Sequence, residues 1–180
     1  MDDDAVGQEN NGVENLLKRL IIQGSWLETC GPSSLESIVA FHGIDMGFLG
    51  PCQPSDVFTM LMHDYRYSKL DKPLPMHRYL DSYPPLIEKL FPTLKGEVIL
   101  YDGKDPSAVI RGNIPCMVNL ISPAHYIACL SIDGDVVTYN ESWMNDKFNP
   151  GSSRIRTILL SDLVKNVKYG ILAVRKVVGK

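Results

Sequence analysis

The spacing of apolar residues changes part-way along the chain. Up to residue 92, apolar residues recur every three or four positions, which is the pattern of a helix that buries one face. This pattern predicts a helix or turn over residues 13–22, a helix from Cys30 to a stop at Gly43, and a helix over residues 56–65. A fourth helical segment is predicted over residues 76–91, bent or restarted at Pro84 and Pro85.

Beyond residue 92, the chain consists of short β-branched runs separated by Gly, Pro and Asp. These runs predict six strands, over residues 97–101, 114–120, 125–132, 135–143, 154–160 and 169–178. Short helices are predicted at 105–112, with Asp105 or Ser107 near its start, and at 162–167, capped by Ser161. Asp133 and Gly134 are typical of a tight turn between two strands of a hairpin. Helices followed by an antiparallel sheet predict an α+β domain.

Length and composition are those of one globular domain. The chain has 180 residues, of which 44% are hydrophobic and 22% are charged. Residues 1–12 are acidic and polar, so we expect a disordered tail there and a single domain over residues 13–180. The net charge is −3 and the basic residues are scattered, which argues against a nucleic-acid partner.

The sequence carries no signal for a membrane, an export pathway or a metal. No run approaches the roughly 18 apolar residues of a membrane-spanning helix, and the N-terminus lacks the basic and apolar regions of a signal peptide. We therefore expect no membrane span and a cytoplasmic protein, with a secreted mature form as the alternative. The four cysteines include no Cys-x-x-Cys pair, so neither a disulfide framework nor a zinc site is indicated. No cofactor is expected.

Cys30 lies where a buried helix is expected to begin. Thr29 can cap this helix, and Gly31, Pro32 and Ser33 suit its first turn. The free N–H groups and the dipole at a helix N-terminus favour an anion, so a thiol there should ionise more readily than that of a free cysteine. Cys30 is therefore the candidate nucleophile. The alternative is a small buried apolar residue, a common role of free cysteine.

A cysteine nucleophile needs a base and a group that orients the base. Of the four histidines, His125 alone stands at the head of an apolar strand, and the others have the context of surface or capping residues. Asn140 lies 15 positions later, on the strand expected to return beside His125 across the hairpin. Its amide oxygen could accept a hydrogen bond from the imidazole, and Trp143 could shield that bond from water.

Three short segments resemble a papain-like cysteine peptidase. They are the opening with Gln, Trp and Thr-Cys-Gly-Pro-Ser-Ser, the Pro-Ala-His-Tyr strand, and Asn-Glu-Ser-Trp. The resemblance is to the branch of the bacterial double-glycine (bacteriocin) leader peptidases and their stand-alone relatives, and it implies a nucleophile helix packed against a C-terminal antiparallel sheet. It also implies Cys30 as nucleophile, His125 as base, Asn140 as orienting residue and Gln23 as the amide that completes the oxyanion hole. The implied substrate is a peptide or protein.

The sequence departs from the family pattern at two positions. Gln23 lies seven residues before Cys30, one more than the family spacing, so the loop between them must bulge or another donor must serve. Asn140 stands where leader peptidases usually have Asp, so their substrate preferences should not be carried over.

Two other functions fit the same residues. Acyltransferases and amidohydrolases of this superfamily share the acyl-enzyme step and differ in what accepts the acyl group. A catalytically inactive relative that binds peptides is the second alternative, and a separation above about 5 Å between the Cys30 sulfur and the His125 ring would favour it. The remaining cysteines, at positions 52, 116 and 129, are expected to be structural.

Overall fold

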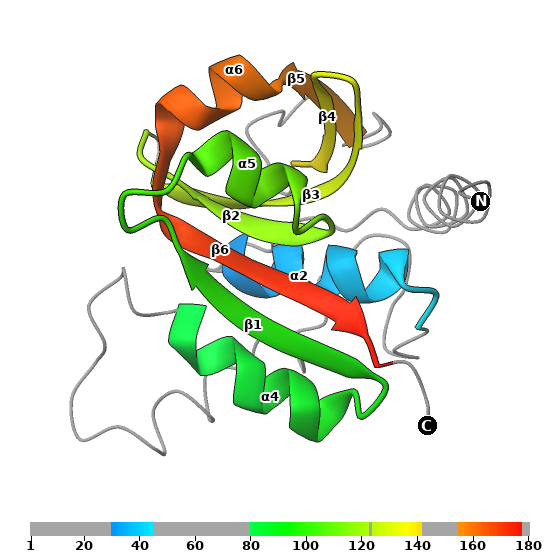
Figure 1. Cartoon of the computed structure of the whole chain (residues 1–180). Helices are drawn as coiled ribbons and strands as arrows, with labels where there is room; N and C mark the ends of the chain where they lie inside the picture. The colour runs from blue at the N-terminus through cyan, green and yellow to red at the C-terminus, as the bar shows by residue number, and fades with distance from the viewer. Residues whose placement is uncertain (1–29, 45–79, 123, 142–154, 178–180) are drawn as a thin grey trace, which may run out of the picture.

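A six-stranded antiparallel sheet organises the fold in the computed structural model, which describes residues 30–44, 80–122, 124–141 and 155–177. The strands follow the order β1-β6-β2-β3-β4-β5 across the sheet (Figure 1). Their bounds are β1 Leu94–Leu100, β2 Cys116–Leu120, β3 His125–Asp133, β4 Val136–Asn140, β5 Ile155–Leu159 and β6 Val167–Lys176. The helices are α2 Cys30–Phe41, α4 Tyr83–Leu90, α5 Pro106–Arg111, α6 Leu160–Leu163 and the 3-10 helix η2 Val164–Asn166. The predicted α+β fold class is confirmed.

Helices cover both faces of the sheet, with α2 and α4 on one side and α5 and α6 on the other (Figure 1). Successive side chains of β3 point to opposite faces of the sheet, and so they pack with different helices. Tyr126, Ala128 and Leu130 pack with α2 and α4, whereas Ile127 and Cys129 pack with α5 and α6. Each face therefore has its own apolar core, which explains why β3 is apolar on both sides.

The helix α2 begins and ends where the sequence predicts. Leu35, Ile38 and Val39 are fully buried in the core between α2 and the sheet. The helix ends at Phe41, and Gly43 follows with a φ of 76°, a conformation that glycine adopts without strain. Burial of this apolar face fixes α2 against the sheet.

The hairpin of β3 and β4 forms as predicted, but its turn lies one residue further along. Asp133 pairs with Val136, so the two turn residues are Gly134 and Asp135. Gly134 has a φ of 55°, which a two-residue hairpin turn requires. The turn position sets which residues of the two strands face each other.

A bulge in β3 changes the register of the hairpin again. The pairing shifts between Cys129 and Ser131, and beyond the shift Asn140 pairs with Ala128. The expectation that Asn140 and His125 face each other across the hairpin is therefore wrong. Ala128, the observed partner of Asn140, lies three residues along β3 from His125.

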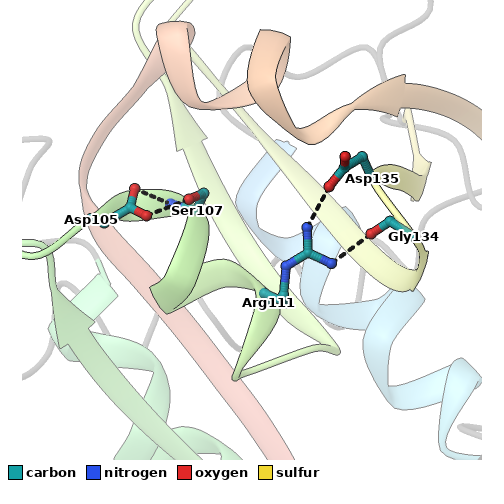
Figure 2. A network of polar contacts seen from close by, with 5 residues as sticks. All are labelled: Asp105, Ser107, Arg111, Gly134 and Asp135. Carbon is teal, nitrogen blue, oxygen red and sulfur yellow. Dashed lines mark hydrogen bonds and ion pairs between the residues drawn. The ribbon is translucent and has the colours of Figure 1, made fainter.

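The helix α5 is joined to this turn by a surface network. Asp105 accepts a hydrogen bond from the backbone N–H of Ser107, 3.0 Å away, and so caps the helix as predicted. Arg111, at the other end of α5, donates to the carbonyl of Gly134 and to the carboxylate of Asp135, at 2.5 and 2.7 Å (Figure 2). The ion pair is exposed and contributes at most about 1 kcal/mol. It ties the closed end of the hairpin to α5.

Most of the remaining described elements agree with the sequence pattern. All six strands are present, and Pro84 and Pro85 lie in the first turn of α4, after a short 3-10 segment. Ser161 is a correction: it lies inside α6, which begins at Leu160 because the backbone is still extended at Leu159. The predicted tail at 1–12 and the helical segments at 13–22 and 56–65 lie outside the described residues. In the described ranges, no helix is long and apolar enough to cross a membrane.

Candidate active site

Cys30 is the first residue of α2 and is partly exposed. Cys116 and Cys129, the other two cysteines that the structure describes, are buried within strands. The first turn of a helix leaves backbone N–H groups without partners inside the helix, so the thiol lies beside groups that favour an anion. Of these three thiols, that of Cys30 is open to a reagent or substrate.

His125, the first residue of β3, lies against Cys30. The ring is buried, with 2% of the residue exposed. The apolar face of α2 packs on β3 and places the helix start at the head of this strand, so that the thiol and the imidazole are close enough to interact electrostatically. The fold therefore brings together the predicted nucleophile and the predicted base from distant parts of the chain.

Glu141 is the second partner of His125, and sequence reasoning missed it. Its Oε1 lies 2.7 Å from Nε2 of the ring, and 18% of its side chain is exposed. This carboxylate occupies Nε2, and the other ring nitrogen, Nδ1, is buried. The available signal was the acidic residue directly after Asn140 in the motif Asn-Glu-Ser-Trp.

The imidazole of His125 is more basic than that of a free histidine. Burial lowers the pKa of His125, but the hydrogen bonds with Cys30 and Glu141 and the negative charge of both partners raise it to about 9 on balance. The ring is therefore positively charged at neutral pH.

Asn140, the predicted orienting residue, has a different partner. Its amide donates to the hydroxyl oxygen of Ser37 on α2, 2.7 Å away, and the residue is 3% exposed. The register of the hairpin directs this side chain toward the helix. Glu141 rather than Asn140 therefore contacts the imidazole of His125.

The other predicted residues separate into two groups. Gln23, Trp143, His63 and His77 lie outside the described residues. His42 is described, and its Nε2 lies 3.0 Å from the carbonyl oxygen of Val174. Burial lowers the pKa of His42 more than this hydrogen bond raises it, so the ring is a neutral donor that joins the end of α2 to β6.

The three clustered side chains can act as nucleophile, base and orienting group. The thiolate of Cys30 can attack a carbonyl carbon, the imidazolium of His125 can donate its proton, and Glu141 can hold the ring in one tautomer. Within the described part of the chain, no three His, Cys, Asp or Glu side chains are arranged to hold a metal ion.

Comparison with known proteins supports the same fold. No protein-family model and no curated protein matches the sequence. Among solved structures, the chain is similar to a double glycine motif protease from an AMS/PCAT transporter, solved in complex with the leader peptide. That match has 13% sequence identity and a TM-score of 0.54, and covers 89% of this chain and 94% of the other.

A second solved structure is less similar. It is the N-terminal peptidase C39 like domain of the toxin secretion ATP-binding protein from Vibrio parahaemolyticus, with 16% identity, a TM-score of 0.36, and coverage of 63% of this chain and 82% of the other. The first similarity shows that this chain shares the fold of that double glycine motif protease. The fold that the sequence resemblance implied is confirmed.

Proposed function

We propose that the protein is a cysteine peptidase that cleaves peptide or amide bonds through an acyl-enzyme. One observation carries the proposal. The partly exposed thiol of Cys30 lies close enough to the ring of His125 to interact electrostatically with it, and Nε2 of that ring lies 2.7 Å from the carboxylate of Glu141. The direct contact between thiol and imidazole supports an enzyme over an inactive peptide-binding relative.

The proposed reaction begins from the ion pair of Cys30 and His125. The thiolate attacks the carbonyl carbon of the substrate, a sulfur–carbon bond forms, and the carbonyl oxygen becomes an oxyanion. His125 gives its proton to the leaving amine as the carbon–nitrogen bond breaks. The neutral ring then takes a proton from water, the resulting hydroxide attacks the acyl carbon, and the sulfur–carbon bond breaks, which releases the acid product and restores the ion pair.

The oxyanion requires hydrogen-bond donors. We assign this role to the backbone N–H of Cys30 at the start of α2 and, from the family resemblance, to the side-chain amide of Gln23. A donor of this kind typically lowers the barrier by about 3 kcal/mol. Gln23→Ala tests the second assignment, because it should lower kcat and leave the alkylation rate of Cys30 unchanged.

The orienting role that the sequence suggested for Asn140 passes to Glu141 in this proposal. A carboxylate at Nε2 holds the ring so that Nδ1 faces the thiol, and it stabilises the positive charge on the imidazolium. The contact of Asn140 with Ser37 leaves its amide directed at the helix instead.

The proposed substrate is a peptide or protein, and no cofactor takes part. The double glycine motif protease with a similar fold was solved with the leader peptide, which supports a peptide as the substrate class. At 13% identity, no preference for a particular peptide sequence is transferred to this chain.

The test is capture of the acyl-enzyme from a peptide library. The wild-type protein should give cleaved products and a covalent acyl adduct on Cys30 by mass spectrometry, and Cys30→Ser should give no thioester adduct and a rate at least about a thousandfold lower. Intact peptides and no adduct with the folded wild type would contradict the proposal and favour an inactive peptide-binding relative. Transfer of the acyl group to an added amine in preference to water would identify an acyltransferase.

A further inference from the structure

Two buried serines lie on the same side of α2 as the nucleophile. Cys30, Ser34 and Ser37 are separated by four and three residues, so they share one face of the helix. Ser34 is 1% exposed and Ser37 is fully buried. Burial of a hydroxyl lowers the stability of the fold unless the hydroxyl forms hydrogen bonds. The hydrogen-bond partners of these two serines therefore indicate their structural role.

Ser34 is joined to the strand that carries the base. Its hydroxyl donates to the backbone carbonyl of Tyr126, 3.0 Å away, and this bond is buried. Tyr126 is the residue directly after His125. The bond therefore fixes α2, one turn after Cys30, to the backbone beside the imidazole.

Ser37 is joined to the strand that carries the orienting carboxylate. Its hydroxyl oxygen accepts a hydrogen bond from the amide of Asn140, at 2.7 Å, and donates to the backbone carbonyl of Ser33, at 2.8 Å. Asn140 is the residue directly before Glu141. The second bond therefore fixes α2 to the backbone beside the carboxylate.

We propose that Ser34 and Ser37, with Asn140 as the partner of Ser37, are positioning residues for the nucleophile and its base. This inference rests on the proposed function. Each of the two hydrogen bonds joins the helix of Cys30 to a residue adjacent in sequence to one of the groups that act on the thiol. Together they set the position of the thiol relative to the His125–Glu141 pair.

Directional contacts suit this task better than apolar packing does. The apolar face of α2 holds the helix on the sheet, but apolar contacts tolerate small sliding movements, whereas a buried hydrogen bond weakens steeply with distance and angle. Displacement of a catalytic group by about 1 Å can lower a rate by about a hundredfold. Loss of either bond should therefore reduce the reactivity of Cys30 more than it disturbs the fold.

The chain offers a matched control in Ser33. This residue lies on the same helix and is fully buried, and among the described residues its hydroxyl has no hydrogen-bond partner. Ser33→Ala removes the same atom as Ser34→Ala and Ser37→Ala, without removing a bond between helix and strand. The backbone carbonyl that accepts from Ser37 is retained.

The experiment measures alkylation of Cys30 by iodoacetamide as a function of pH. The rate is followed on the peptide containing Cys30 by mass spectrometry, well below the melting temperature of every variant. Ser34→Ala and Ser37→Ala should slow alkylation at neutral pH by about tenfold or more and change the shape of the pH profile, because the thiol is no longer held in place beside the imidazole. Ser33→Ala should keep the wild-type rate and midpoint.

A double-mutant cycle tests the Ser37 bond from its other end. Asn140→Ala should change the pH profile of alkylation as Ser37→Ala does. The double variant should alkylate at nearly the same rate as either single variant, because both changes remove the same hydrogen bond. This variant also keeps the test open if Ser37→Ala fails to fold.

The outcomes separate this inference from the proposed function. If wild-type Cys30 reacts no faster than a free thiol, the proposed function fails, and the positioning role with it. If wild-type Cys30 is reactive and the three variants match Ser33→Ala, only the positioning role is overturned. A lower melting temperature with an unchanged pH profile would likewise show that the serines serve stability alone.

Discussion

At the residue scale, the state of the candidate site depends on the charge of His125. The ring lies between a thiol and a carboxylate, and the hydrogen bonds and charges of these partners outweigh the effect of burial on its pKa. The fold therefore stabilises the protonated ring. Any change that removes the carboxylate should alter both the reactivity of Cys30 and the dependence of stability on pH.

This charge makes part of the stability pH-dependent. The pKa of His125 is about 9 in the folded protein and about 6.5 in an unfolded chain. The protonated ring therefore makes its full contribution to the free energy of unfolding below about pH 6.5. The contribution disappears as the pH rises from about 6.5 to 9. Calorimetry of the wild type should show a falling melting temperature over this range, and Glu141→Gln should show a smaller fall.

The control for this prediction is Asp135→Asn. Asp135 is an exposed carboxylate paired with Arg111, so its loss removes one negative charge without touching the imidazole. For Asp135→Asn, the melting temperature should fall between pH 6.5 and 9 as steeply as it does for the wild type. If the melting temperature of Glu141→Gln fell as steeply with pH as that of the wild type, the carboxylate would not be what stabilises the protonated ring of His125.

At the element scale, α2 and α4 pack closely beside the nucleophile. A Cβ atom at Gly31 would lie 2.1 Å from the hydroxyl oxygen of Tyr83 and 3.3 Å from its Cζ atom. Tyr83 is fully buried, so its ring has little freedom to move away. Glycine is therefore required at position 31 by contact between helices.

Gly31→Ala should destabilise the protein by about 1–3 kcal/mol, because it adds a methyl group to a filled space. Addition of Tyr83→Phe removes the oxygen nearest to the new methyl group and should restore part of the loss. Chemical denaturation of the wild type, the two single variants and the double variant measures the coupling. Additive losses in the double variant would contradict the assignment of the clash to the Tyr83 hydroxyl.

At the scale of the whole molecule, the two faces of the sheet differ in the cysteines that pack against them. The face covered by α2 and α4 carries the candidate site at its edge, whereas the face covered by α5 and α6 is a closed apolar core. Cys116 and Cys129 pair across β2 and β3 within this second core and are fully buried. The hydrogen bond with Cys129 and burial both raise the pKa of Cys116, so this thiol stays neutral.

Thiol alkylation should therefore distinguish the two faces. Native protein treated with iodoacetamide at neutral pH should be modified at Cys30, while Cys116 and Cys129 react only when the sheet opens. Peptide mapping with and without denaturant provides the measurement, and the denatured protein is the control for intrinsic reactivity. Modification of Cys116 in the native protein at the rate of Cys30 would contradict the closed core.

Much of this organisation could be predicted from local patterns in the sequence. Cys30 at a helix start follows from a turn-forming segment before apolar residues at helical spacing, and His125 at the head of a strand follows from a polar residue before an apolar run. Gly134 in a hairpin turn follows from its tolerance of positive φ. Each of these depends on residues near one another in the chain.

The contacts of Asn140 and Glu141 could not be predicted in this way. Their directions depend on the turn at Gly134–Asp135 and on the bulge between Cys129 and Ser131. A register change of one residue alters which side chain faces a given neighbour, and no local pattern specifies it. The strand register therefore decided which of two adjacent polar residues meets the imidazole.

The sequence by itself determined the element types, the α+β class and the positions of a candidate thiol and a candidate base, because helix and strand periodicities and turn residues act over short distances. Only the tertiary structure decided that Glu141 contacts His125 and that Ser34 and Ser37 join α2 to the strands beside it. These contacts join segments that are distant in the chain, so they depend on how the helix packs on the sheet and on how the strands align.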